Sequence, residues 1–258
     1  MIIAVESVLM DACFKKEKTV SNKPDPHPFK MRGESMTRIE TFVAAAFAFA
    51  VTMLVISVGT VPETMQQFVD ATKQIPAFTA SCAIIMWIWH THAMWCRRYG
   101  LEDGMTIFLS SSLIILVLTY VYPLRLIMQS LFNTLSHGFF PMELSFKSAW
   151  EVRFMFAFYA IGFSLLCLNF IVLYLYAMSK HKLLQLNEFE YFDSQSEVYM
   201  WLLGVGVCVA SLMLALWLPI GMIGYAGYVL FILFPLLTAL RLYRGSRRKR
   251  MIIETDCG

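Results

Sequence analysis

Residues 198–240 contain no Lys, Arg, Asp or Glu, and this uncharged run constrains the fold more than any other feature of the sequence. At about 1.5 Å per residue, one helix of that length would be roughly twice as long as the hydrocarbon core of a bilayer is thick. Pro219 and Gly221 lie in the middle of the run, where a break is needed. We therefore predict two membrane-spanning helices here, because a charged side chain at the bilayer centre costs at least about 2.5 kcal/mol.

The same test finds four more uncharged stretches, each of about the 20 residues that a spanning helix needs. A hydrophobic content of 58% and a mean hydropathy of +0.62 also disfavour a water-soluble core. The predicted fold is an all-α integral membrane protein with a transmembrane domain at 37–244, between tails at 1–36 and 245–258. Its six spans are expected at about 38–60, 75–97, 104–128, 151–179, 198–218 and 221–243.

The distribution of basic residues predicts the orientation of these spans. If both termini are cytoplasmic, 17 of the 21 Lys and Arg residues lie on the cytoplasmic side. We therefore predict an N-in, C-in topology. The basic run at 247–250 is interpreted as an anchor that meets anionic lipid, with no nucleic-acid partner expected.

Two stretches between the spans are predicted to lie outside the bilayer core. Residues 126–142 are apolar but too short for a seventh span, and they suggest an extension of the third helix followed by an interfacial segment. Residues 180–197 are interpreted as a polar cytoplasmic linker. The six cysteines show no spacing typical of a metal site. His90 and His92 are about 200° apart around a helix and cannot face one site. We expect no metal, no cofactor and no catalytic residues.

The first span has two distinct faces at helical spacing. A seam of large apolar residues is formed by Phe42, Phe49, Met53 and Ile56. The other face is rich in alanine, and small residues let helices approach closely in lipid. We expect the alanine face to pack tightly against neighbouring helices, with the seam on the opposite side. The alanine face comprises Ala44, Ala45, Ala46, Ala48 and Ala50. On composition alone, contact of the seam with lipid or another helix is favoured over a hydrophobic pore constriction.

Several short motifs, in this order and spacing, resemble the transmembrane protein 175 family of endosomal and lysosomal potassium channels, in its single-repeat bacterial form. The resemblance covers residues 36–125. It is carried by R-x-x-x-F at Arg38–Phe42, Val61-Pro62, W-x-x-H at Trp89–His92, Arg97 and Asp103-Gly104.

This resemblance implies a homotetramer in a bacterial inner membrane, with the first helix of each subunit lining a central pore for K⁺. The pore constriction then falls on Phe49, Met53 and Ile56, which is the seam found from spacing. Thr52 would offer its hydroxyl oxygen to a dehydrated cation.

The family also has a polar network behind the pore, which this sequence modifies. Val43 and Ala44 replace the Ser and Asp of the family's R-x-x-x-F-S-D motif, and Ser110 replaces an Asn. Glu40 lies one helical turn before Ala44 and can supply the missing charge. The residues expected to form the network here are Arg38, Glu40, His92, Asp103 and Ser110.

Two functions are compatible with these features. The first is a potassium-preferring cation channel with passive conduction through a hydrophobic constriction. The alternative is a non-conducting membrane scaffold or sensor that keeps the channel fold, favoured by the lost Ser and Asp and by the bulk of Phe49. An intramembrane enzyme or a carrier is disfavoured, because paired reactive groups and internal repeats are not evident in the sequence.

Overall fold

A computed structural model of the chain describes residues 29–33, 35–57, 62–142, 148–218, 236–240 and 242–244. The regular structure assigned to these residues is helical, which confirms the predicted all-α class. The chain forms two compact units, Met1–Arg98 with Val117–Leu144, and Tyr99–Leu116 with Ser145–Gly258. The predicted tails and the predicted span at 221–243 fall largely outside the described residues.

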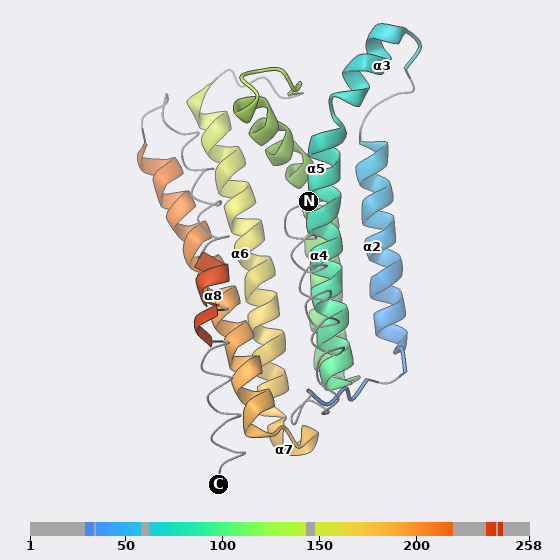
Figure 1. Cartoon of the computed structure of the whole chain (residues 1–258), viewed down its shortest axis with the longest axis vertical. Helices are drawn as coiled ribbons and strands as arrows, with labels where there is room; N and C mark the ends of the chain where they lie inside the picture. Colours follow the sequence, from blue (N-terminus) through green and yellow to red (C-terminus); the bar gives the residue numbers. More distant parts are fainter. Residues whose placement is uncertain are drawn as a thin grey trace, which may run out of the picture. The chain divides into compact units, whose positions relative to one another are not determined.

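In the first unit, α2 (Arg38–Ile56) and α4 (Ile75–Tyr99) run in opposite directions, and the short α3 (Met65–Thr72) lies between them in sequence (Figure 1). The second half of α5 (Gly104–Leu135) completes this unit. Side-chain caps fix where these helices begin. Thr37 accepts a hydrogen bond from the backbone N–H of Glu40, which satisfies one of the donors that a helix leaves open at its start.

The residues just before α2 are bound to the end of α4. The backbone N–H groups of Arg32 and Gly33 donate to the carbonyl oxygen of Arg97 at 3.1 and 3.0 Å. The approach is close, because a Cβ atom on Gly33 would lie 2.7 Å from the carbonyl oxygen of Cys96. This part of the predicted N-terminal tail therefore satisfies one open carbonyl group at the end of α4, that of Arg97.

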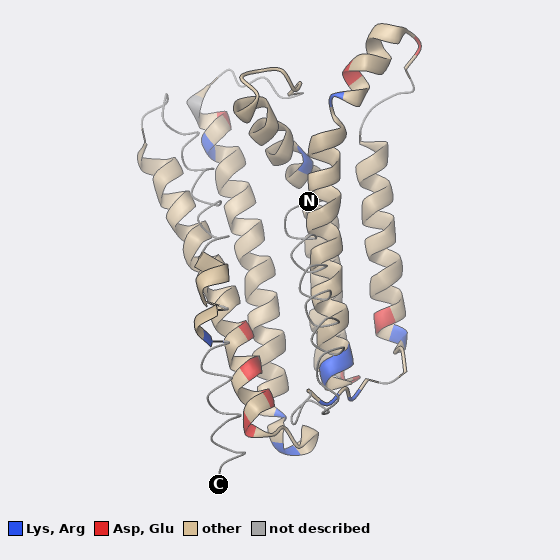
Figure 2. Ribbon diagram, in the orientation of Figure 1, with Lys and Arg blue, Asp and Glu red and all other residues tan. Residues whose placement is uncertain are grey.

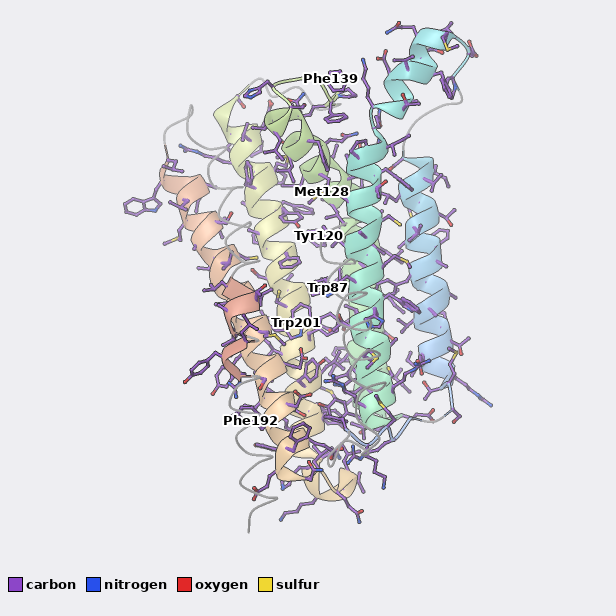
Figure 3. The ribbon with its side chains drawn as sticks, viewed as in Figure 1. Trp87, Tyr120, Met128, Phe139, Phe192 and Trp201 are labelled. Atoms are coloured by element: carbon purple, nitrogen blue, oxygen red, sulfur yellow. The ribbon has the colours of Figure 1, made fainter. Side chains whose placement is uncertain are left out.

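In the second unit, α6 (Ala149–Ser179) and α8 (Glu188–Trp217) are antiparallel partners joined through α7 (His181–Leu184). Trp201, labelled in Figure 3, stacks on Phe170 with ring centroids 4.4 Å apart. One turn further along α8, a Cβ atom on Gly204 would lie only 3.1 Å from Sγ of Cys167. Aromatic stacking and a missing side chain thus let the two helices pack closely.

Four of the described helices, α2, α5, α6 and α8, are long and apolar enough to cross a membrane by length and composition. Figure 2 shows long stretches of these helices without charged residues. Helix α4 has 25 residues, about 37 Å of length, and carries Arg97 and Arg98 in its last turn. The chain is a multi-pass membrane protein that is all-helical in its described part, while the six-span count and the N-in, C-in orientation stay predictions.

Two helices are longer than their predicted spans. Helix α5 continues to Leu135, as predicted for the extension of the third helix. Helix α8 begins at Glu188, so the second half of the predicted polar linker at 180–197 is helical. Asn187 and Glu190 form a capping box there, and two acidic residues in the first turn complement the helix dipole. Charged residues mark where lipid ends, but they do not stop a helix.

A substitution at Gly204 tests the close packing of α6 and α8. We expect Gly204→Leu to destabilise the fold by about 1–3 kcal/mol, because Cys167 is fully buried and overpacking forces a shift. Gly206→Leu is the matched control, since open space surrounds that position on the same helix. Thermal unfolding in detergent measures both. Equal unfolding midpoints for Gly204→Leu and Gly206→Leu would contradict the close contact between Gly204 and Cys167.

Candidate functional site

Helix α2 buries one stripe and exposes the opposite one. The buried stripe repeats every three or four residues and consists of Glu40, Val43, Phe47, Ala50 and Leu54. The predicted seam is exposed, with Phe42 at 62%, Phe49 at 56%, Met53 at 42% and Ile56 at 70%. The seam therefore faces away from the core of its own unit, as predicted from spacing.

The alanines of α2 behave differently from the prediction. Only Ala50 is buried, whereas Ala45 and Ala48 are exposed. The tight face is instead filled by Phe47 and Leu54, with Ala50 between them. The buried face of α2 therefore combines large side chains with one small residue and is not an alanine face.

Thr52 lies on the exposed part of α2, close to the seam. Its hydroxyl donates to the carbonyl oxygen of Ala48, one turn earlier, at 3.0 Å. This bond uses the only proton of the hydroxyl, so the oxygen presents lone pairs to its surroundings. A threonine held in this way can accept a hydrogen bond or coordinate a cation.

The buried stripe of α2 begins at Glu40, which lies in the neighbourhood of Cys96 of α4. His92 is buried one turn before Cys96, with its Nδ1 atom 3.7 Å from the Cys96 sulfur and its ring stacked on Trp95. His90 is exposed, so the two histidines do face different directions, as predicted. Arg38, at the start of α2, is exposed.

Asp103 and Ser110 lie in the second unit. Ser110 is buried in α5. Asp103 precedes α5, and its Oδ1 atom accepts hydrogen bonds from the backbone N–H of Thr106 at 3.1 Å and from the Thr106 hydroxyl at 2.8 Å. Its other oxygen accepts from the Tyr176 hydroxyl of α6. Asp103 thus caps α5 and joins it to α6. A single network of all five predicted residues stays a prediction.

These bonds change the acidity of Asp103. Partial burial raises the pKa of its carboxyl, but the hydrogen bonds from Tyr176 and Thr106 lower it by more, and Lys180 adds to the lowering. The pKa therefore lies below its usual value. Hydrogen bonds to the charged form are the physical cause of the net change.

Sequence reasoning missed a polar cluster at the C-terminal end of α2. Arg125 of α5 is 1% exposed, and its guanidinium donates to the carbonyl oxygen of Ser57 and to the side-chain oxygen of Gln74. Gln129, also buried, donates to the same Gln74 oxygen at 3.4 Å. The available signal in the sequence was Arg125 itself, which directly follows a long uncharged stretch and lies inside the predicted span at 104–128.

No group of three or more His, Cys, Asp or Glu side chains that could bind a metal occurs within the part of the chain that the structure describes. The arrangement found there is instead an exposed apolar seam on one helix, a hydroxyl beside it and polar contacts on the opposite side. Such an arrangement can line a passage or an interface, and it offers no assembled set of reacting groups.

The chain is similar to known potassium channels. The model of the family described as endosomal/lysosomal potassium channel TMEM175 matches residues 38–123. A protein named potassium channel from Marivirga tractuosa is 34% identical over 193 residues, which cover 73% of this chain and 78% of that protein. A crystal structure of a threonine-to-alanine variant of the potassium channel MtTMEM175, in complex with a nanobody–MBP fusion protein, matches with a TM-score of 0.73 and 29% identity. That match covers 86% of this chain and 99% of the other.

The Asp103 cap gives a pH-dependent prediction. Because the folded-state pKa lies below the usual value of about 3.9, the carboxylate stabilises the fold above that pH, and this is lost as the pH falls through the lowered pKa. We expect Asp103→Ala to lower the free energy of unfolding by about 1 kcal/mol at pH 7, as for other N-caps, because solvent screens part of the electrostatic gain. This difference in free energy between the wild type and the variant should become smaller as the pH is lowered.

Unfolding of the wild type and the variant in detergent, at neutral and at acid pH, measures this difference. Glu102→Ala is the control, because Glu102 is an exposed neighbour. A loss for Asp103→Ala that is independent of pH would show that the charge of the cap does not matter.

Proposed function

This chain belongs to the TMEM175 family of potassium channels, and from that premise we propose that it is a potassium-preferring cation channel whose pore is lined by α2. The family and the relatives are ion channels, not enzymes. The proposal extends this by assigning the pore to a particular helix face and the conduction to a passive, partly dehydrating passage.

The observation that carries the proposal is the two-sided character of α2. Its buried stripe is already used inside its own unit, while the seam presents large apolar side chains outward. In a membrane, such a face meets lipid or another copy of the chain. We assign it to other copies, because a channel needs a closed ring of helices and the exposed stripe also carries a hydroxyl at Thr52. Four copies would place their seams around one axis.

The constriction is proposed at three successive levels of the seam, at Phe49, Met53 and Ile56. These residues follow one another at intervals of four and three residues, so each lies about one helical turn beyond the last. Rings of apolar side chains hold water weakly, and they can gate by dewetting. Phe49 is the largest of the three and would set the narrowest level.

Ion passage in this proposal needs no carbonyl-lined filter. A cation would lose part of its hydration at the apolar rings and gain compensation from the Thr52 oxygens. K⁺ holds its water less tightly than the smaller Na⁺, so a dehydrating constriction favours K⁺. No TVGYG-like run occurs in the sequence, which agrees with a side-chain constriction.

The remaining features are proposed from the sequence. The membrane is a bacterial inner membrane, the six spans keep both termini in the cytoplasm, and the chain forms a homotetramer. The polar groups behind the pore are Arg38, Glu40, His92, Asp103 and Ser110. Among them, Glu40 and His92 are buried within the first unit, where they can stabilise the start of α2 against α4.

One observation favours a second function. The positions of the family's Ser and Asp are held by Val43 and Ala44, and Val43 is almost fully buried in an apolar contact. Phe49 adds bulk at the proposed constriction. A chain with this fold and a closed ring would act as a scaffold or sensor. Ion flux distinguishes the two functions directly.

We expect Phe49→Ala to pass K⁺ several-fold faster than the wild type in reconstituted liposomes, because removing four rings widens and wets the constriction. Both should pass K⁺ faster than Na⁺. Phe108→Ala is the matched control, since Phe108 is a similarly exposed phenylalanine on α5, and it should leave the flux unchanged. If neither the wild type nor Phe49→Ala passes a monovalent cation, the channel proposal fails and the scaffold remains.

A further inference from the structure

We propose that Arg125 of α5 is a positioning residue that fixes the C-terminal end of α2 and thereby sets which side chains α2 presents to the pore. The proposal rests on the proposed function for its effect on ions. The contact itself lies wholly within the first unit and can be tested separately.

The end of α2 needs an external partner. A helix leaves its last carbonyl groups without intrahelical donors, and they carry the negative end of the helix dipole. Ser57 supplies part of the cap, since its N–H donates to the carbonyl of Met53 and its hydroxyl to that of Leu54 at 2.7 Å. The last turn of α2 contains no basic residue. The positive charge comes instead from Arg125, which donates to the Ser57 carbonyl oxygen.

The same guanidinium joins three helices. Its other terminal nitrogen donates to the side-chain oxygen of Gln74, directly before α4, and Gln129 of α5 donates to that oxygen as well. A planar guanidinium can serve two acceptors at fixed angles, which a lysine ammonium cannot do in the same way. Arg125 is 1% exposed, so water does not compete strongly for these bonds.

This contact lies next to the proposed constriction. Ile56 immediately precedes Ser57, and Met53 lies one turn earlier on the seam. Leu54 and Ile56 are two residues apart and therefore point in nearly opposite directions around the helix, so Leu54 becomes exposed only if the last turn of α2 loosens or turns substantially. A fixed Ser57 carbonyl holds this turn in place. Arg125 therefore determines the orientation of the seam without touching an ion.

The chain contains a matched comparison in its second unit. Arg153 of α6 donates to the carbonyl oxygen of Leu218, the C-cap of α8, at 3.0 Å. Helix α8 also has no basic residue in its last turn. Both contacts are hydrogen bonds from an arginine to the carbonyl oxygen of a helix C-cap, but only Arg125 contacts the end of α2. Arg153→Gln thus controls for the loss of an arginine that caps a helix end.

The test uses the full chain in detergent and compares the reactivity of each introduced cysteine with and without Arg125. Cysteines are introduced singly as Leu54→Cys and Ile56→Cys, and their rates with a water-soluble thiol reagent are measured above the background of the native cysteines. Leu54 is fully buried and Ile56 is 70% exposed, so in a chain that keeps Arg125 the reagent should label Ile56→Cys and not Leu54→Cys. With Arg125→Gln, we expect labelling of Leu54→Cys to rise several-fold. Arg153→Gln should change neither rate.

The proposal is overturned if Arg125→Gln elutes as folded protein and the labelling rate of Leu54→Cys is unchanged. If Arg125→Gln does not fold, Gln74→Ala gives a second test, since it removes the acceptor that holds the Arg125 guanidinium in place beside Ser57 and should weaken that contact. A smaller rise at Leu54→Cys supports the proposal, and no rise overturns it.

Liposome flux separates this proposal from the proposed function. If the wild type conducts, Arg125→Gln should reduce the ratio of K⁺ to Na⁺ flux several-fold, while Arg153→Gln keeps the wild-type ratio. An unchanged ratio in both overturns the positioning role and leaves the channel standing. If Phe49→Ala and the wild type both fail to conduct, the channel fails, and the labelling result alone decides whether Arg125 holds the end of α2.

Discussion

The cost of leaving a polar group without a partner in lipid is the constraint on which the whole structure depends. It explains why the described helices α2, α5, α6 and α8 contain long uncharged stretches. It also explains the polar groups that do lie inside. Arg125 donates to a backbone carbonyl and an amide oxygen, and the Asn169 amide of α6 donates to the carbonyl of Leu109 at 3.1 Å. Each such group joins helices because lipid offers it no alternative.

The same constraint gives α2 its two faces. One stripe is used for packing, with Glu40 at one end and the Ser57 cap at the other, both next to polar groups of the first unit. The opposite stripe has large apolar side chains, with Thr52 as its polar member turned back to its own backbone. A helix held at both ends and apolar on its outer side can form a wall between copies, and this is the role that the proposed channel needs.

Much of the fold could be predicted from the sequence, because charge gaps report directly on lipid. The gap before Glu63 and the gap after Asp103 locate α2 and the start of α5. The start of α8 could not be found in this way, since the polar turns after Asn187 are helical outside the apolar stretch. Charge gaps mark the membrane, whereas capping residues mark the ends of helices.

The candidate site was predictable where it depends on periodicity and not where it depends on distant pairing. The spacing of Phe49, Met53 and Ile56 placed them on one face without a structure. The tight face was predicted to be formed by alanines, but Phe47 and Leu54 are the large side chains buried there, because burial depends on which neighbouring elements cover the helix and not on residue size alone. Arg125 and its partner Ser57 are 68 residues apart in sequence, and a single sequence gives no signal for such a contact.

Accessibility of α2 to water in the membrane tests the central claim most directly. Single cysteines placed along residues 42–56 in liposomes would be treated with a membrane-impermeant thiol reagent. The account predicts fast reaction at the positions of Phe49, Met53 and Ile56, slow reaction at Phe47 and Leu54, and a repeat of three to four residues. Reaction confined to Phe47 and Leu54, or no reaction along the helix, would contradict a pore lined by this face.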